Sequence, residues 1–357
     1  MGLPNISINF KSTAAAAIAR SQKGVVGLIL KDSNAEVQNG GYVIGSAADI
    51  PDALDAGNRA YIGRALIGYI NPPRAIRVVV LPYDTADLTA GLAYFATVEV
   101  DYLCGPHDCT SAEAAAIAAW VKSRRVAHSI VKAVLPKTAA DSEGIVNVAA
   151  EGAIIDGATL TAAALCSRIA GLIAGTPMTI SCTYAPLPEI TDIARMSREE
   201  LDEAIDAGRL VLCHDGEKVK VARGVNSLVT TTQDKGAAFR KIKVVEIIDM
   251  IQNDIRRVCE DSYIGKYANS YDNKCVLISA IKGYFEGLEL AGLLDAGKSV
   301  CEIDVAAQAN YLHARGVDTM AMSARELKEA NTDDQVFIAC SVKILDAIED
   351  ISINVTL

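Results

Sequence analysis

The chain has 357 residues, of which 51% are hydrophobic and only 5% are aromatic, and its formal net charge is −10. Because one hydrophobic core rarely organises so long a chain, we expect two domains. The acidic balance argues against nucleic acid as a partner, and no apolar run approaches the roughly eighteen residues of a membrane span. The N-terminus lacks the features of a signal peptide, so we expect assembly in a cytoplasm.

Both ends of the chain alternate apolar and polar residues, as strands with one buried face do. The apolar positions of these two arms are Ile6, Ile8, Phe10, Ile351, Ile353, Val355 and Leu357. Burying four such side chains yields roughly 6–12 kcal/mol, whereas fixing seven backbone residues costs roughly 7–14 kcal/mol. Each arm should therefore order only on an existing sheet edge. That edge belongs either to its own chain or to a neighbouring subunit in a polymer.

Between the arms, the first part of the chain alternates strand-like and helix-like segments. Runs rich in apolar and β-branched residues predict strands at 24–30, 75–81, 98–103 and 129–135. Capping boxes at Thr110–Glu113 and Ser197–Glu200 predict helix starts, and a helical pattern at 162–174 ends at Gly175. This alternation predicts an α/β domain over residues 23–222, with a mostly parallel sheet flanked by helices.

The pattern changes near residue 225. Expected strands lie at 219–221, 225–230, 300–305 and 335–344, and expected helices at 241–261, 273–290 and from Ser323. The first of these helices has an apolar face made of Val244, Ile248, Ile251, Ile255 and Val258. An α+β C-terminal domain is therefore predicted over residues 223–345. An N-terminal arm and connector (1–22) and a C-terminal arm (346–357) complete the expected organisation.

One segment matches the spacing of a nucleotide-binding loop. Gly292 to Ser299 contains two glycines followed by Lys298 and a serine, as in the Walker A motif. In a phosphate loop a strand enters and a helix leaves, whereas here the predicted helix enters and the predicted strand leaves. Gly292 or Gly297 is better explained as a left-handed helix cap. A P-loop-type enzyme stays an alternative, for which loss of ATP binding in Lys298→Ala would be the test.

Other catalytic residue types lack a diagnostic arrangement. Cys213, His214 and Asp215 are adjacent, and neighbours on a strand point to opposite faces. Cys104, His107 and Cys109 offer three metal ligands without a second pair at zinc-finger spacing. Most of the nine cysteines lie in apolar runs, as buried thiols of a reducing compartment do. We predict no catalytic residue, metal or cofactor, and an α/β hydrolase-like enzyme stays a second alternative.

A local basic cluster stands out on this acidic chain. It consists of Lys235, Arg240, Lys241 and Lys243, at the start of the predicted long helix. Basic charge at a helix N-terminus is unfavourable by roughly 0.3–1 kcal/mol. An acidic partner surface would explain why it is tolerated.

Several segments, in this order, resemble one known family. They are Gly2–Phe10, Val221–Leu228 with its arginine, Phe239–Asp249, Tyr263–Lys266, Gly287–Leu294 and Ile344–Val355. Together they resemble the tail sheath proteins of contractile phage tails and R-type bacteriocins, in particular the compact Gram-positive type. The C-terminal third carries the most specific part of this resemblance. The family has no catalytic residues to carry over.

The resemblance implies a helical homopolymer of stacked rings around an inner tail tube. The arms would add strands to the C-terminal domains of neighbouring copies, and the basic cluster would face the tube. A metastable extended sheath would contract on a baseplate signal and drive the tube through a target cell envelope. The arms would stay paired while the bodies rotate, so Lys11 to Gly24 and Asp346 to Asp350 are the expected hinges.

The resemblance also sets the expected partners and location. The partners would be other copies of the chain, the tube protein, the baseplate and the tail terminator, without direct contact to nucleic acid or insertion into a membrane. The protein would be assembled in the bacterial cytoplasm. It would then belong to a virion tail or to a released bacteriocin particle.

Overall fold

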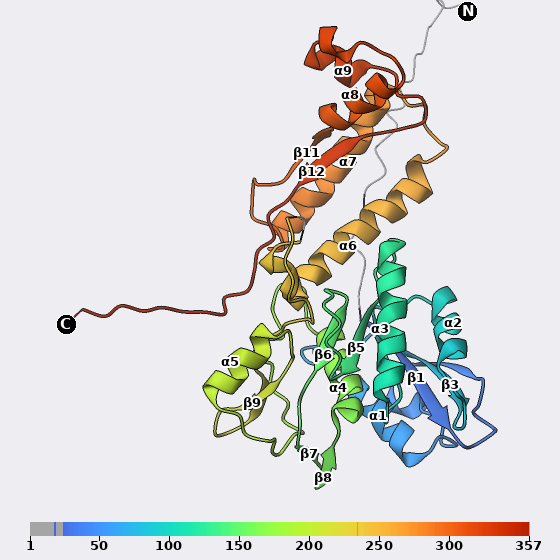
Figure 1. The fold of residues 1–357 in the computed structure, drawn as a ribbon, viewed down its shortest axis with the longest axis vertical. Coiled ribbons are helices and arrows are strands. Elements are labelled where there is room, and N and C mark those ends of the chain that lie inside the picture. Colours follow the sequence, from blue (N-terminus) through green and yellow to red (C-terminus); the bar gives the residue numbers. More distant parts are fainter. Residues whose placement is uncertain (1–17, 19–23, 234, 357) are drawn as a thin grey trace, which may run out of the picture. The chain divides into compact units, whose positions relative to one another are not determined.

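The computed structural model describes residues 18, 24–233 and 235–356, which divide into two compact units (Figure 1). The central unit contains 24–249 and 346–356, and the C-terminal unit contains 250–345. The predicted arm residues Ile6, Ile8, Phe10, Lys11 and Leu357 lie outside the described residues. No helix in the described part of the chain is long and apolar enough to cross a membrane.

A six-stranded sheet in the order β2-β3-β1-β4-β5-β6 organises the central unit. Its strands are β1 (Val25–Asp32), β2 (Gly41–Ile44), β3 (Ala75–Pro82), β4 (Tyr102–Cys104), β5 (Lys132–Pro136) and β6 (Ile145–Val148). Only β2 runs antiparallel to its neighbour. Every residue of β1 except Lys31 is buried, as expected for a parallel strand covered on both faces.

Helices cover both faces of this sheet. Val26, Leu28 and Leu30 of β1 share a core with side chains of α1 (Ala56–Leu66) and α4 (Ala162–Ala174). Val25 and Ile29 point to the opposite core, which includes α2 (Thr89–Thr97) and α3 (Ser111–Val126). The period-two alternation of one strand thus supplies two cores. The parallel-rich sheet flanked by helices confirms the mixed α/β prediction.

Smaller elements complete the central unit. They are β7 (Ala153–Ile155), β8 (Ala158–Leu160), α5 (Arg198–Asp206), β9 (Leu212–His214), β10 (Val219–Val221) and the 3-10 turns Ala47–Asp49 and Ala237–Arg240. Both capping boxes form as predicted, because Thr110 and Ser197 each accept a backbone N–H from a glutamate whose carboxylate accepts in return.

The long helix α6 (Ile242–Val258) begins in the central unit and ends in the C-terminal unit. Val244 of its predicted apolar face is buried, but Ile248, Ile251, Ile255 and Val258 are only partly buried. Three polar residues, Glu246, Asp249 and Asn253, are at most 7% exposed instead. The predicted face is therefore wrong as the main contact, because Glu246 and Asp249 are buried against charged partners far away in sequence, Lys132 and Arg125.

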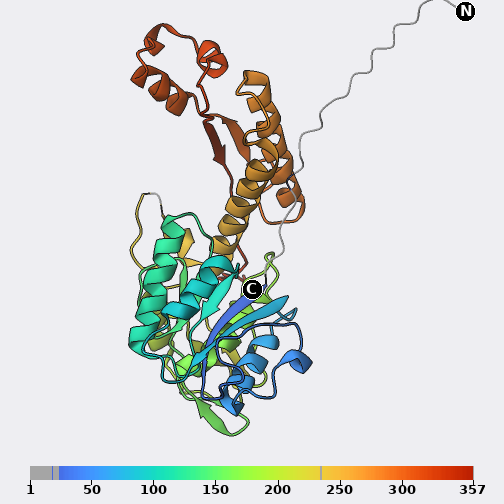
Figure 2. The same cartoon turned by 90° about the vertical axis from the view of Figure 1, so that its right-hand side faces the viewer.

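The C-terminal unit combines helices with a two-stranded antiparallel sheet. Its elements are a π-helical turn (Cys259–Tyr263), α7 (Tyr271–Leu290), β11 (Val300–Ile303), α8 (Val305–Ala314), a 3-10 turn (Thr319–Ala321), α9 (Ala324–Glu329) and β12 (Ile338–Ser341). Figure 2 shows β11 and β12 side by side next to α7. In this unit Lys274 is buried and donates to Gln308 and Thr332.

The predicted strand at 225–230 is wrong. Only Val225 forms an isolated bridge, with Lys241. The following amides are used differently: Ser227 N–H donates to the carbonyl of Ile145, and Val229 and Thr230 both donate to the carboxylate of Asp141. A carboxylate that accepts two successive amides holds the segment as a loop rather than a strand.

Candidate assembly interface

The start of the C-terminal arm is attached to the central unit by its acidic residues. Glu349 accepts from Arg223 Nε at 3.1 Å, from Ser181 Oγ at 2.9 Å and from Thr183 Oγ1 at 2.6 Å. The Glu349 side chain is only 7% exposed. Arg223 also pairs through Nη2 with Asp350, at 2.5 Å. One arginine therefore holds two successive carboxylates of the arm.

A second ion pair lies at the first residue of the arm. Asp346 pairs with Lys241, whose Nζ is also 3.8 Å from a carboxylate oxygen of Glu349. Burial alone would raise the pKa of Asp346, but the hydrogen bonds from Lys241 and the Ala347 amide, together with the charges of Lys241 and Lys243, outweigh burial and the pKa is lowered. A lowered carboxyl pKa stabilises the folded arm above the ordinary aspartate value and loses that effect as the pH falls below it. The anchor should accordingly weaken under acid conditions.

Beyond Asp350 the arm makes no secondary structure in the described residues (Figure 1). Ile351, Ile353 and Val355 are 72%, 78% and 78% exposed. An alternating apolar row with so much exposure is unfavourable in water, since each buried side chain of this kind yields about 1.5–3 kcal/mol. The arm thus consists of an acidic segment, 346–350, that is anchored to the central unit, followed by an alternating apolar segment from Ile351 that is exposed.

Replacing Arg223 by methionine should release residues 346–350 without unfolding the central unit. A hydrogen bond to a charged group contributes about 1.5–3 kcal/mol, so the population of detached arm should rise roughly ten- to hundredfold. The rate of cleavage after Glu349 by a glutamate-specific protease, followed by mass spectrometry, measures this population. Arg195→Met is the matched control because Arg195 pairs with Asp192 only at an exposed site. An unchanged rate of cleavage after Glu349 in Arg223→Met would contradict the anchor.

The predicted basic cluster has acceptors within its own chain. Lys235 pairs with Glu143, and Arg240 donates to the carbonyls of Ile205 and Asp206. Lys241 holds Asp346, and Lys243 is 6% exposed and donates to the carbonyl of Thr179. The unfavourable charge at the start of α6 is therefore already compensated in the monomer.

The loop with Walker A spacing binds a carboxylate of the chain itself. Gly292 and Gly297 both have positive φ, of 69° and 70°, after the end of α7. The amides of Gly297 and Ser299 donate to the carboxylate of Glu289, at 2.9 and 3.3 Å. A helix enters the loop and β11 leaves it, as the sequence predicted. Glu289 thus occupies amides that a phosphate loop would offer to its ligand.

The cysteine-containing motifs are also explained locally. Asp215 pairs with Lys220 and accepts the amides of Glu217 and Lys218, so it caps the turn between β9 and β10. Burial, together with the charge of Glu113, raises the pKa of Cys109 to about 12, so the thiol stays protonated at neutral pH. Among the described residues, no group of three His, Cys, Asp or Glu side chains is arranged to hold a metal ion.

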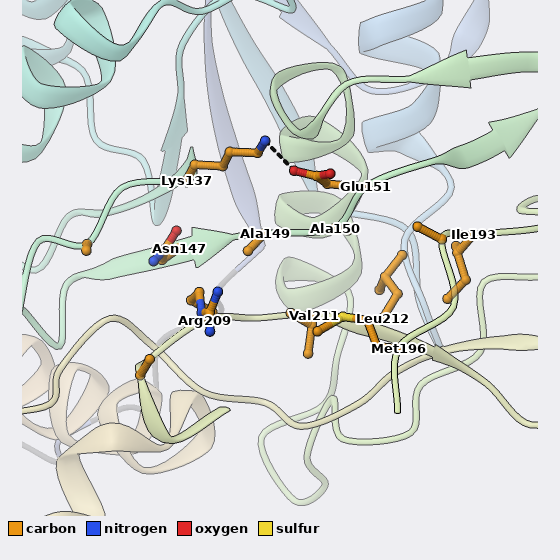
Figure 3. Close-up of a pocket in the computed structure, with 13 residues that line it drawn as sticks. Lys137, Asn147, Ala149, Ala150, Glu151, Ile193, Met196, Arg209, Val211 and Leu212 are labelled. Atoms are coloured by element: carbon orange, nitrogen blue, oxygen red, sulfur yellow. Dashed lines mark ion pairs between the residues drawn. The ribbon is translucent and has the colours of Figure 1, made fainter. Parts of the chain in front are cut away.

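A cavity of about 580 Å³ opens beside the ends of β5 and β6 (Figure 3). Its lining is mostly alanine and aliphatic, with Asn147 and three charged side chains. Lys137 and Glu151 pair across it, although their side chains are 61% and 62% exposed. Arg209 lies near Asn147 on the facing segment. Among the described residues that line it, none is a serine, cysteine or histidine.

Two family models match the chain. The phage tail sheath protein central domain matches residues 82–227, and the phage tail sheath C-terminal domain matches residues 234–357. A tail sheath protein of Clostridium phage phiCD119 is 38% identical over 359 aligned residues, which cover 99% of both chains. This chain belongs to the phage tail sheath protein family. The predicted resemblance is confirmed.

Solved structures agree with this assignment at the level of the fold. The sheath tail protein from Desulfitobacterium hafniense matches with a TM-score of 0.70 and 19% identity, over 84% of this chain and 94% of that one. A chain in the six-fold symmetrised baseplate of the anti-feeding prophage matches with a TM-score of 0.66 and 15% identity, over 100% and 99%. The sheath protein is thus a structural component of a phage tail or a contractile injection system, and neither enzyme alternative gains support.

Sequence reasoning missed the anchor of the arm. The sequence places Arg223 in a sheath-like segment but contains no motif that pairs it with Glu349, or that brings Ser181 and Thr183 to the same site. The available signal was the acidic pair Glu349-Asp350 interrupting an otherwise apolar alternation. The basic partner of such a pair, more than 120 residues away, could not be chosen without the fold.

Proposed function

We propose that this sheath protein polymerises by exchange of β-strands between subunits. The exposed apolar row of the C-terminal arm, Ile351, Ile353 and Val355, carries this proposal. When the arm adds as a strand to an existing sheet edge, its backbone N–H and C=O groups form hydrogen bonds with that edge, and its apolar face is covered. The N-terminal arm, with Ile6, Ile8 and Phe10, would act in the same way.

The C-terminal unit supplies a suitable edge. In the described residues its sheet contains only β11 and β12, so both strands have an outer edge with unpaired backbone groups. A bond from the arm of one copy to the sheet of the next is a heterologous contact, which builds rings or filaments rather than closed dimers. The expected product is a helical sheath around an inner tail tube.

Contraction follows if the polymer has two packings. A metastable extended sheath would relax to the contracted form when the baseplate signals. The free energy released by each subunit can be small, because it adds up over all subunits of the lattice. The arms would remain paired while the bodies rotate. Lys11 to Gly24 and Asp346 to Asp350 remain the proposed hinges. At the C-terminal hinge, the ion pairs of Arg223 and Lys241 would set the direction of the arm.

The proposed partners are other copies of the chain, the tube protein, the baseplate and the tail terminator. Contact of Lys235, Arg240, Lys241 and Lys243 with an acidic tube surface stays a prediction. Such contact requires these side chains to leave the carboxylates and carbonyls that they contact within the chain and to bind acceptors on the tube instead. Assembly would take place in the bacterial cytoplasm, before the protein joins a virion tail or a released bacteriocin particle.

Electron microscopy of negatively stained protein tests the exchange. The full chain should form hollow rods, alone or with tube protein. Replacing Ile351, Ile353 and Val355 together by serine should abolish the rods, because the arm loses the side chains that a neighbour would bury. The variant should remain a folded monomer, since all three side chains are largely exposed in the described structure.

The matched control changes the other face of the same strand. Ser352, Asn354 and Thr356 replaced together by alanine keep the apolar row and should still give rods. Rods that survive loss of the apolar row would overturn the strand-exchange proposal. Monomers from the full chain at high concentration with tube protein present would overturn it as well.

A further inference from the structure

The two-stranded sheet of the C-terminal unit places two cysteines directly opposite each other. Cys301 of β11 is the register partner of Cys340 of β12, and their sulfur atoms lie 2.8 Å apart. Opposed residues of antiparallel strands have Cα atoms about 4.5–5.5 Å apart, a separation that disulfides bridge. The two residues can therefore be joined without moving the backbone.

The environments of the two thiols differ. Cys301 is fully buried, whereas Cys340 is exposed. The contact with Cys301 lowers the pKa of Cys340, while the same contact and burial raise the pKa of Cys301. The accessible thiol is thus the more acidic one, and the thiolate is the form that attacks a disulfide. Both cysteines are free in this structure.

We infer that Cys301 and Cys340 form a disulfide bond when the protein enters an oxidising medium, and that this bond fixes β12 to β11. The sheet has only four residue pairs, and β12 is the last strand before the C-terminal arm. The mechanical part of this inference rests on the proposed function: a pull on an exchanged arm that breaks the ion pairs of Arg223 and Lys241 would reach β12 next. A covalent link would stop the strand from peeling away.

A small-molecule disulfide such as oxidised glutathione is the oxidant. The Cys340 thiolate attacks one of its sulfurs, the small disulfide bond breaks and one small thiolate leaves. The Cys301 thiolate then attacks the Cys340 sulfur of the mixed disulfide and releases the second small thiolate. The two cysteine protons pass through water to the released thiolates, and the two electrons reduce the oxidant. In a reducing cytoplasm the same pair stays a dithiol.

Thiol counting on the full-length protein tests the bond. The protein is equilibrated with excess oxidised glutathione, denatured and titrated with a thiol reagent. Two of its nine thiols should be lost, and peptide mapping should join Cys301 to Cys340. Amide exchange in 338–341 should slow, and dithiothreitol should reverse both changes.

Three variants make the outcome decisive. Cys340→Ser and Cys301→Ser should each prevent the loss of the two thiols, and Cys340→Ser changes an exposed site and should fold normally. Cys275→Ser, at a half-buried position on α7, should leave the oxidation unchanged. Nine remaining thiols, or a bridge between other cysteines, would overturn the inference. Thiols are counted and peptides mapped after denaturation, so these readouts do not depend on polymerisation, and a failure to form rods in electron microscopy would bear on strand exchange alone.

Discussion

Replacing Lys132 by methionine should lower the free energy of unfolding of the central unit by about 3–5 kcal/mol, the usual loss when one partner of a buried ion pair is removed. The Lys132 Nζ lies 2.9 Å from Asp249 and 3.2 Å from Glu246. None of the three side chains is more than 5% exposed. The variant would leave two carboxylates in the interior with fewer compensating charges. Urea denaturation followed by circular dichroism measures the change.

The stability lost in Lys132→Met should depend on pH in a defined direction. Burial alone would lower the pKa of Lys132, but Asp249 and Glu246 outweigh it and raise the pKa above its ordinary value. A raised lysine pKa stabilises the folded state fully below the unfolded value of about 10.4. The difference between wild type and Lys132→Met should therefore be constant near neutral pH. It should shrink only when the pH rises above that value.

Lys137→Met is the matched control. Lys137 follows the same strand and pairs with Glu151, but both side chains are more than 60% exposed. Exposed pairs contribute about 0–1 kcal/mol, so this variant should unfold almost like the wild type. Equal losses in the two variants would show that the buried cluster has no special role.

The same cluster explains where prediction from sequence reached its limit. Arg125 forms two bonds of 2.9 Å with Asp249, its partner 124 residues away. Glu246 accepts from the Tyr102 hydroxyl across 144 residues. A helical pattern ranks faces by hydrophobicity, so it assigned the inner face of α6 to isoleucines and valines. Hydrophobicity alone does not predict that Glu246 and Asp249 are buried, because their burial depends on pairing with Lys132 and Arg125.

Features that depend on a few neighbouring residues were predictable. The capping boxes at Thr110 and Ser197 formed, because each pairs groups only three residues apart. Gly292 adopts positive φ after α7, as a helix cap does. The alternation from Ile351 to Val355 is also local, but it predicts a covered apolar face, whereas these side chains are exposed in this chain. By contrast, the Arg223 anchor and the opposed pair of Cys301 and Cys340 depend on long-range register, which a single sequence does not contain.

Replacing Gly171 by alanine should destabilise the central unit by about 3 kcal/mol, at the upper end of the usual overpacking loss. A Cβ atom at Gly171 would lie 2.0 Å from the carbonyl oxygen of Ala65. Because Ala65 belongs to α1 and Gly171 to α4, the clash is between helix backbones and no side-chain rotation relieves it. The two helices would have to separate within the core that they form under the sheet. The midpoint of urea unfolding should fall accordingly.

Gly63→Ala tests this reasoning with the same chemical change and the opposite expected sign. Gly63 also lies inside a helix, α1, but a Cβ atom there would meet nothing within 4 Å. Alanine in a helix interior is favoured over glycine by about 0.5–1 kcal/mol, so this variant should be slightly more stable than the wild type. If Gly171→Ala also gained stability, α1 and α4 could not be in the close backbone contact on which the packing of the central unit depends.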